Sequence, residues 1–145
     1  IGGMEFKGKI DCLNIEKGYF VDIKTTKSDI DSMVWVQDEA SGRNIQVRWF
    51  EAWGYVLQMA TYKKMLEEQY GKEFTPVIYA VTKEPTPDTR AIVFQSQEKL
   101  DYELTELSML IQRLDKVKKG EEEAKPCGHC EYCKTKALSQ RVEVI

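Results

Sequence analysis

Hydrophobic residues alternate with polar ones at the start of the chain and recur at helical spacing further on. Two roughly alternating runs, residues 4–13 and 19–26, flank a short polar stretch with a glycine, a pattern typical of a β-hairpin. From about residue 45 to residue 70, apolar residues recur at steps of three and four, which predicts a helix. The remaining predicted elements are listed in chain order: strands at 75–81 and 91–94, then an amphipathic helix at 97–119 that ends at Gly120.

The predicted hairpin places two aspartates and a lysine on one face. If its turn centres near Glu16 and Lys17, paired residue numbers sum to about 33, so Asp11 lies opposite Asp22. Directly opposed side chains on antiparallel strands are roughly 5 Å apart. Lys24 follows Asp22 by two residues, and alternate residues of a strand share a face. The pattern therefore gathers two carboxylates and one ammonium into a single patch.

A divalent cation is a natural partner for such a patch. Opposed carboxylates repel each other unless something compensates their charge. Mg²⁺ favours one or two carboxylates together with water and the phosphate oxygens of a substrate. A nearby lysine can position or activate a water, or stabilise charge on a phosphate. The alternative is an ordinary hairpin whose charged side chains face solvent.

The predicted helix before Gly71 contributes a second pair of candidate residues. Gln58 and Tyr62 are four residues apart, so they lie on one face of the helix, one turn from each other. The alternative is a surface glutamine and a half-buried tyrosine without a functional role. For the aromatic residues at helical spacing, Trp49 and Trp53 among them, we favour a place in the hydrophobic core over a role in stacking on nucleic-acid bases.

The stretch between the hairpin and this helix has a weaker pattern. Residues 33–36 are apolar, and residues 41–44 are typical of a loop. One interpretation is a segment that contacts the substrate. We favour a surface connection that is packed by Trp35, because most loops merely connect elements.

Composition fits one folded domain. The chain has 145 residues, 42% of them hydrophobic, which is enough for a real core. It has no apolar run of about 18 residues and no signal-peptide core, so we expect a cytoplasmic protein with no membrane partner. Because the chain opens almost directly in a predicted strand, we also expect further residues upstream.

Charge argues against a broadly basic nucleic-acid surface, because the formal net charge is −3 and the pI is about 5.3. A metal-dependent nuclease remains open, since its site is acidic and its ions supply positive charge locally. A local basic rim would draw on these residues: Lys7, Lys9, Lys24, Lys27, Arg43 and Arg48.

The tail at 121–145 carries three thiols, and we expect it to pack on a core domain at 1–120. Cys127, Cys130 and Cys133 have the spacing C-x₂-C-x₂-C in what we expect to be a turn-rich loop. One interpretation is a second metal site, either Zn²⁺ or an iron–sulfur cluster, although such sites usually have four ligands. The other is a set of reduced thiols. Cys12, next to Asp11, should point to the opposite face of the hairpin.

Together the motifs resemble a known superfamily. Gly8-x-x-Asp11, then Asp22-x-Lys24, then Gln58-x-x-x-Tyr62 in the following helix, is similar to the PD-(D/E)XK nucleases, in the RecB-like and lambda-exonuclease-like branch. The turn at 83–85 and the cysteine-containing tail further resemble phage or prophage exonucleases of the exodeoxyribonuclease VIII (RecE-like) type. The resemblance implies an α/β (α+β) fold, with a restriction-endonuclease-like mixed β-sheet flanked by helices. We expect the N-terminal helix of that fold to be missing from this chain.

The resemblance also implies roles for single residues. Asp11 and Asp22 would bind Mg²⁺ or Mn²⁺, with the backbone carbonyl of Ile23 as a further ligand. Lys24 would orient or help deprotonate the attacking water. Gln58 and Tyr62 would support the site or contact the DNA strand.

The reaction implied is metal-dependent hydrolysis of phosphodiester bonds in linear double-stranded DNA by an exonuclease of phage-type recombination. The resemblance also raises a single-strand annealing protein and a homo-oligomer as partners. Two alternatives stay open: a non-catalytic nuclease-fold module that binds DNA or protein, and an endonuclease or repair nuclease on the same fold. A third is a small cysteine-rich interaction domain in which the metal of the tail matters most.

Overall fold

The structure is a computed structural model, and it describes residues 1–27, 29–38, 41–126 and 130–137. The chain forms two compact units, residues 1–110 and 111–145, and the division falls inside helix α3 (Gln97–Lys119). The first unit contains every residue of the predicted hairpin site. The expected domain boundary at residue 120 stays a prediction.

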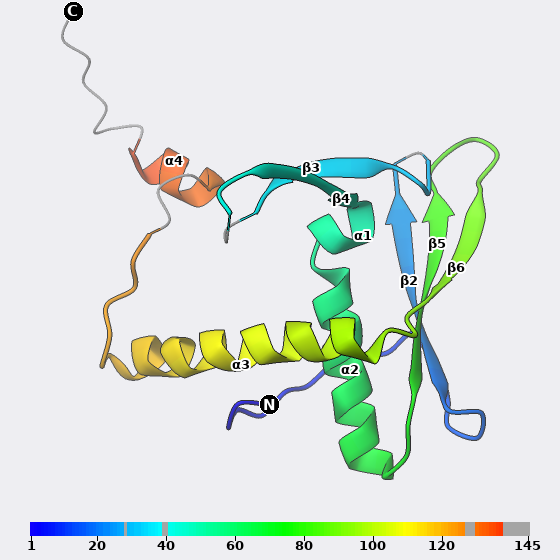
Figure 1. Cartoon of the computed structure of the whole chain (residues 1–145), viewed down its shortest axis with the longest axis horizontal. Helices are drawn as coiled ribbons and strands as arrows, with labels where there is room; N and C mark the ends of the chain where they lie inside the picture. Colours follow the sequence, from blue (N-terminus) through cyan, green and yellow to red (C-terminus); the bar gives the residue numbers. More distant parts are fainter. Residues whose placement is uncertain (28, 39–40, 127–129, 138–145) are drawn as a thin grey trace, which may run out of the picture. The chain divides into compact units, whose positions relative to one another are not determined.

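A four-stranded mixed sheet forms the frame of the first unit (Figure 1). Its order is β1 (Cys12–Asn14), β2 (Tyr19–Thr26), β5 (Thr75–Thr82) and β6 (Thr89–Val93). The two central strands, β2 and β5, pair in parallel, and both outer pairs are antiparallel. Parallel neighbours need a long crossover, which residues between β2 and β5 supply with a helix. The fold class expected from the sequence, a mixed sheet with flanking helices, is confirmed.

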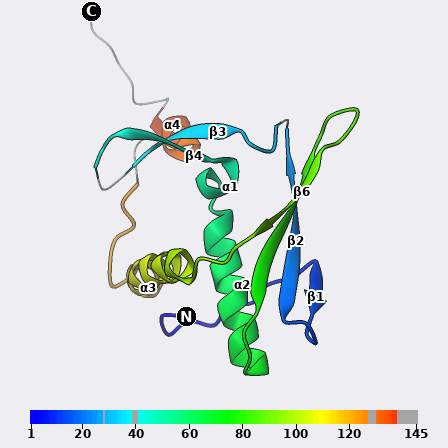
Figure 2. The ribbon, with the colours of Figure 1, turned by 45° about the vertical axis from the view of Figure 1, so that its right-hand side comes forward.

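Helix α2 (Tyr55–Tyr70) belongs to this crossover and covers one face of the sheet (Figure 2). Even-numbered residues of β2 and β5 face it, because alternate residues share a face. Phe20 and Ile78 on the sheet and Met59 on the helix are each 0% exposed and form the centre of the core. The helix ends at Gly71 in the left-handed conformation, with φ of 65°, as the sequence predicts.

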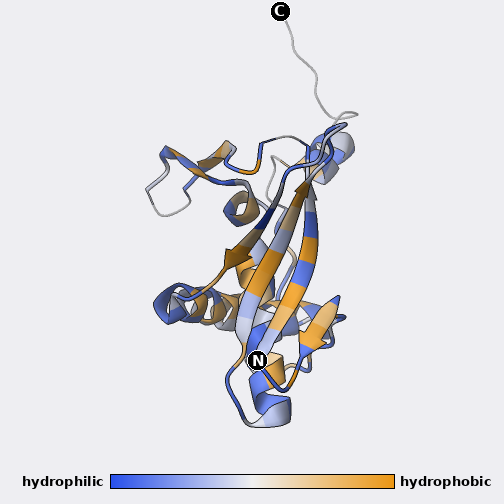
Figure 3. Ribbon diagram, turned by 90° about the vertical axis from the view of Figure 1, so that its right-hand side faces the viewer, coloured by the Kyte–Doolittle hydropathy of each residue, from blue (hydrophilic) through white to orange (hydrophobic). Residues whose placement is uncertain are grey.

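The opposite face of the sheet is apolar but open to solvent in the described part of the chain. Ile23 pairs with Tyr79, and their exposed fractions are 55% and 41%. Val93, which pairs with Val77, is 47% exposed. Figure 3 shows how hydrophobic residues recur along the ribbons of these strands. Hydrophobic residues on both faces of β2 and β5 are typical of strands whose sheet is covered on both sides.

A second, two-stranded sheet corrects the prediction for residues 33–48. β3 (Met33–Gln37) and β4 (Asn44–Arg48) form an antiparallel hairpin, in which Trp35 pairs with Gln46. The expected helix start near residue 45 is therefore wrong. The prediction that Trp35 packs a surface connection is also wrong, because this side chain is 66% exposed. The physical reason is that the β-branched residues of β4 alternate and complete a hairpin with β3.

The helical part begins only after this hairpin, in two pieces. α1 (Trp49–Ala52) is short, and Gly54, in the left-handed conformation with φ of 68°, separates it from α2. Trp49 is buried, as expected of a core aromatic residue, whereas Trp53 is 67% exposed. The sequence pattern therefore merges a strand, a one-turn helix and a long helix into one element.

The predicted first hairpin has the expected register but a shorter first strand. Cys12 pairs with Val21 and Leu13 with Phe20, so paired residue numbers sum to 33. Strand β1 begins at Cys12, and residues 4–10 have no regular structure, although the alternating pattern predicts a strand there. The register nevertheless places Asp11 immediately before the pair Cys12–Val21, at the level of Asp22.

The second unit contains the C-terminal part of α3 and helix α4 (Glu131–Ala137). Gly120 follows α3 with φ of 74°, as its predicted stop. The prediction of a turn-rich loop around the cysteines is wrong from residue 131 on, because helix α4 begins there. No helix in the described ranges is long and apolar enough to span a membrane.

Candidate active site

Strand β2 presents Asp22 and Lys24 on its inner face, next to the core residue Phe20. Asp22 is 4% exposed, and its Oδ2 lies 2.6 Å from Nζ of Lys24. This Oδ2 nevertheless has no hydrogen bond of good geometry, so the ammonium is close but poorly aligned with it. A buried carboxylate oxygen without a well-aligned donor is costly unless another group satisfies it. Asp22 therefore has a free acceptor position beside a positive charge.

Asp11 is fixed at the same place by the backbone of β2. Its Oδ2 accepts a hydrogen bond of 2.8 Å from the amide N–H of Ile23, the residue between Asp22 and Lys24. Asp11 itself is exposed. The sequence pattern predicts Asp11 opposite Asp22. The hydrogen bond from the Ile23 amide, which the pattern does not reveal, also ties Asp11 to this part of β2.

The residues of α2 reach the same region through Tyr62. Nε2 of Gln58 donates a hydrogen bond of 3.1 Å to the hydroxyl of Tyr62. The Tyr62 ring packs on Phe20 at 6.3 Å between ring centroids. A Cβ added at Gly8 would lie only 2.5 Å from Cε1 of the same ring. The glycine of the first motif thus allows the tyrosine of the third to pack against the strand of the second.

Tyr55 is a neighbour of the site that sequence reasoning did not select. The Nζ of Lys24 lies 4.4 Å from the centre of the Tyr55 ring, within the range of a cation–π interaction. The Tyr55 ring in turn packs edge-on against Trp49 at 5.9 Å. Its position three residues before Gln58 is the signal that could have found it, because residues three apart share a helix face.

The residues present fit a hard divalent cation. Carboxylate oxygens are the ligands that Mg²⁺ and Mn²⁺ take in proteins. Within the described ranges, no group of three or more histidine, cysteine or acidic residues is placed to hold a metal. Mg²⁺ binds through one or two carboxylates plus waters and substrate phosphates, so the pair Asp11 and Asp22 suffices as its protein part. This fit rests on the buried Oδ2 of Asp22, which forms an ion pair with Lys24 but has no well-aligned hydrogen-bond donor.

The root of the β3–β4 hairpin lies beside this site and is held by charge. Asp31 accepts hydrogen bonds from Arg90, at 2.6 Å, and from Arg48, at 3.0 Å. The hydrogen bond from Arg90, with the charges of both guanidinium groups, holds the pKa of Asp31 below its ordinary value of 3.8. Arg48 also donates to the carbonyl of Ile30 at 3.3 Å. Arg48, one of the residues of the predicted basic rim, therefore holds the base of the hairpin through its bonds to Asp31 and Ile30.

The described residues include two of the three cysteines of the tail, Cys130 and Cys133. Cys127 lies outside the described residues. Cys130 precedes α4 and Cys133 lies within it, and the amide of Cys133 is 3.5 Å from Sγ of Cys130. The Zn²⁺ or iron–sulfur interpretation stays a prediction. Cys12 is an exposed free thiol opposite Val21, on the other face of the hairpin from Asp22, as expected.

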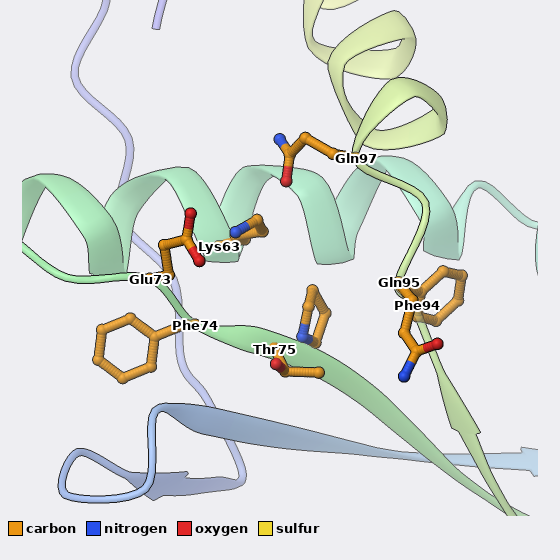
Figure 4. Close-up of a pocket in the computed structure, with 8 residues that line it drawn as sticks. Lys63, Glu73, Phe74, Thr75, Phe94, Gln95 and Gln97 are labelled. Atoms are coloured by element: carbon orange, nitrogen blue, oxygen red, sulfur yellow. The ribbon is translucent and has the colours of Figure 1, made fainter.

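A pocket elsewhere on the first unit does not involve the carboxylate pair. It has a volume of about 200 Å³ and opens where the start of β5 meets α2 and the start of α3 (Figure 4). Lys63 of α2, which lines it, forms an ion pair with Glu67 one turn further along the helix. Its lining residues are Lys63, Glu73, Phe74, Thr75, Pro76, Phe94, Gln95 and Gln97.

The mixed sheet carries Asp22 and Lys24 on its central strand β2, and Asp11, just before β1, is hydrogen-bonded to the same strand. This arrangement is that of a PD-(D/E)XK nuclease-like domain. The family profile "PDDEXK-like domain of unknown function (DUF3799)" matches residues 1–136, and the chain belongs to this family.

A solved structure gives independent support for the fold. A protein from Eubacterium rectale named "Putative exonuclease" superposes with a TM-score of 0.78 and 29% sequence identity. The match covers 100% of this chain and 50% of that one, so this chain spans half the length of its relative. No curated protein matches the chain.

Proposed function

We propose that the protein is a metal-dependent deoxyribonuclease that degrades linear double-stranded DNA from its ends. The observation that carries this proposal is the buried carboxylate of Asp22, whose Oδ2 has no well-aligned donor and lies 2.6 Å from the Lys24 ammonium. Asp11 supplies the second carboxylate, held by the Ile23 amide. The family match and the name of the structural relative support a nuclease.

Each residue has a role that follows from its position. Asp11 and Asp22 would hold Mg²⁺ or Mn²⁺, with the Ile23 carbonyl as a further ligand. When bound, the cation supplies positive charge to a phosphodiester and lowers the pKa of water. Lys24 orients the attacking water or stabilises the phosphate charge, and Tyr55 positions the Lys24 ammonium. Gln58 holds the Tyr62 hydroxyl, and both brace the site or contact the DNA strand.

Within this function we further propose an exonuclease of the RecE-like type that serves phage-type recombination. A single-strand annealing protein would then take over the strand that digestion exposes. Support comes from the motif resemblance and from the name of the relative, which describes that protein alone. Comparison of linear duplex with closed circular duplex as substrate tests the point, because an exonuclease needs an end. Equal rates on both substrates would assign an endonuclease instead.

The test of the active site is the loss of Mg²⁺-dependent degradation in Asp22→Asn and Lys24→Ala. Both variants should lose the activity while circular dichroism and melting remain close to the parent. Glu68→Gln is the matched control, because Glu68 also pairs with a lysine, Lys64 at 3.2 Å, but on the exposed side of α2. An undiminished rate in either purified site variant would refute the assignment.

A further inference from the structure

Trp35, on the β3–β4 hairpin, does not pack into the hydrophobic core. It is 66% exposed at the middle of β3. Its strand neighbour Val34 points to the other face and packs against the core cluster. An exposed tryptophan offers a large apolar ring that a binding partner can cover.

The face around Trp35 has a composition suited to nucleobases. Alternate residues of β3 share this face with their cross-strand partners, so Gln46 lies opposite Trp35 and Asn44 opposite Gln37. These side chains are exposed and none is acidic. An aromatic ring can stack on a base of any sequence, and amide groups can hydrogen-bond base edges. Trp35, Gln37, Asn44 and Gln46 thus offer an aromatic ring and amide groups and bring no negative charge to this face.

Side-chain contacts connect the hairpin to the candidate active site. The indole N–H of Trp49, directly after β4, donates to the carbonyl of Ile30 at 2.9 Å, just before β3. Trp49 packs on Tyr55, and Tyr55 lies under the Lys24 ammonium. Figures 1 and 2 show β3 starting near the end of β2 and β4 returning into α1. A continuous series of contacts therefore links Lys24, through Tyr55 and Trp49, to the start of the hairpin.

We infer that Trp35 stacks on an unpaired base of the DNA strand held at the active site. The inference rests on the proposed function and adds the binding element for single-stranded ends. Gln46, and Gln37 with Asn44, would contact the edges of the same base or its neighbour. The site then prefers DNA whose end is single-stranded or frayed over a fully paired end.

Binding of a labelled single strand and of a blunt duplex, measured by fluorescence anisotropy with Ca²⁺ in place of Mg²⁺, tests the inference. Trp35→Ala should weaken single-strand binding by about five- to a hundredfold, the range for loss of one stacked base, and Trp35→Phe should restore most of it. Trp53→Ala is the matched control, because Trp53 is 67% exposed but lies outside the hairpin, and its binding should equal that of the parent.

The intrinsic fluorescence of the protein gives a second readout. Of the three tryptophans, Trp49 is buried, so in a Trp53→Phe background Trp35 is the exposed emitter. The single strand should quench it. Unchanged affinity of Trp35→Ala, equal losses in Trp35→Ala and Trp53→Ala, or no quenching would overturn the inference, as would a change in oligomeric state on Trp35→Ala with binding intact.

Failure of this inference is separable from failure of the proposed function. If Trp35→Ala binds and cleaves like the parent, while Lys24→Ala binds but does not cleave, the nuclease stands and the stacking role falls. If the parent neither binds nor cleaves DNA in the presence of Mg²⁺, both fall together.

Discussion

Gly8 lies against the ring of Tyr62, and this contact joins the first and third motifs of the site. We expect Gly8→Ala to destabilise the protein by about 1–3 kcal/mol, because its Cβ would lie 2.5 Å from Cε1 of Tyr62 and the ring already packs on Phe20. Denaturant unfolding measures the loss. In a Tyr62→Ala background the same substitution should cost little, and a full cost there would show that the ring is not the obstacle.

In the proposed mechanism Tyr55 positions the Lys24 ammonium and does not itself contact the reacting atoms. We expect Tyr55→Leu to lower kcat by roughly two- to thirtyfold, the equivalent of about 0.5–2 kcal/mol, because the ammonium loses the ring 4.4 Å away. KM should change little. Tyr55→Phe keeps the ring and should keep the rate, whereas a similar loss in both variants would point to the hydroxyl and against this positioning role.

Side chains of the site differ in how well a sequence pattern predicts them. The register sum of 33 predicted from the turn is confirmed by the pairs Cys12–Val21 and Leu13–Phe20, because register follows from the turn and the fixed two-residue period of a strand. The bond from the Ile23 amide to Asp11 and the ring under Lys24 depend on side-chain rotamers and on packing between distant elements. No spacing rule contains that information.

Among the elements, the segment at 45–54 shows where patterns fail. Residues at 45–48 pair with β3 although their spacing also fits a helix, because tertiary pairing overrides a weak local preference. Helix α3 and the strands β2 and β5 follow their patterns closely, and α2 ends at Gly71 as its pattern predicts. Gly54 marks a break that a run of apolar residues at helical spacing conceals.

Gly54 keeps α1 and α2 as separate helices. Nothing lies within 4 Å of a Cβ at this position, so substitution should act on the backbone alone. With φ of 68°, Gly54→Ala should lower the free energy of unfolding by about 1 kcal/mol. Gly54→Asn should cost less, because asparagine tolerates the left-handed conformation better. Urea unfolding of both variants measures the difference, and equal stability of parent and Gly54→Ala would contradict the assigned conformation.

The hairpin root depends on the ionised form of Asp31. The hydrogen bond from Arg90 and the neighbouring positive charges lower the pKa of Asp31 in the folded protein. The ionised carboxylate therefore stabilises the fold fully above pH 3.8, and this stabilisation is lost as the pH falls through the lower pKa of the folded state. Asp31→Asn should therefore be less stable than the parent at neutral pH, and the difference should shrink below pH 3.8. Thermal unfolding at stepped pH checks this. A difference that does not vary with pH would exclude the ionic contribution.

At the scale of the whole molecule, the sequence predicts the fold class, but it does not predict whether both faces of the sheet are covered. The order of strands and helices, with motifs on a hairpin and a following helix, indicates a PD-(D/E)XK domain, and the family match over residues 1–136 agrees. Apolar residues on both sides of β2 and β5 suggest burial on both sides, but Ile23 and Tyr79 are exposed in the described part of the chain. A periodic pattern identifies an apolar face without identifying what covers it.

The net charge of −3 bears on the proposed function. If the protein cleaves DNA as proposed, this charge does not favour attraction by a broad basic surface, and Lys24 and a cation at the aspartates would meet the phosphate charge locally. The account therefore depends on one claim above the others: adjacent strands bring Asp11 and Asp22 together as a divalent-cation site.

Calorimetric titration with Mn²⁺ tests that claim most directly. The parent and Glu68→Gln should show saturable binding, Asp22→Asn should show none, and Asp11→Asn should bind more weakly. Absence of saturable binding to the folded parent, or undiminished binding to folded Asp22→Asn, would contradict it.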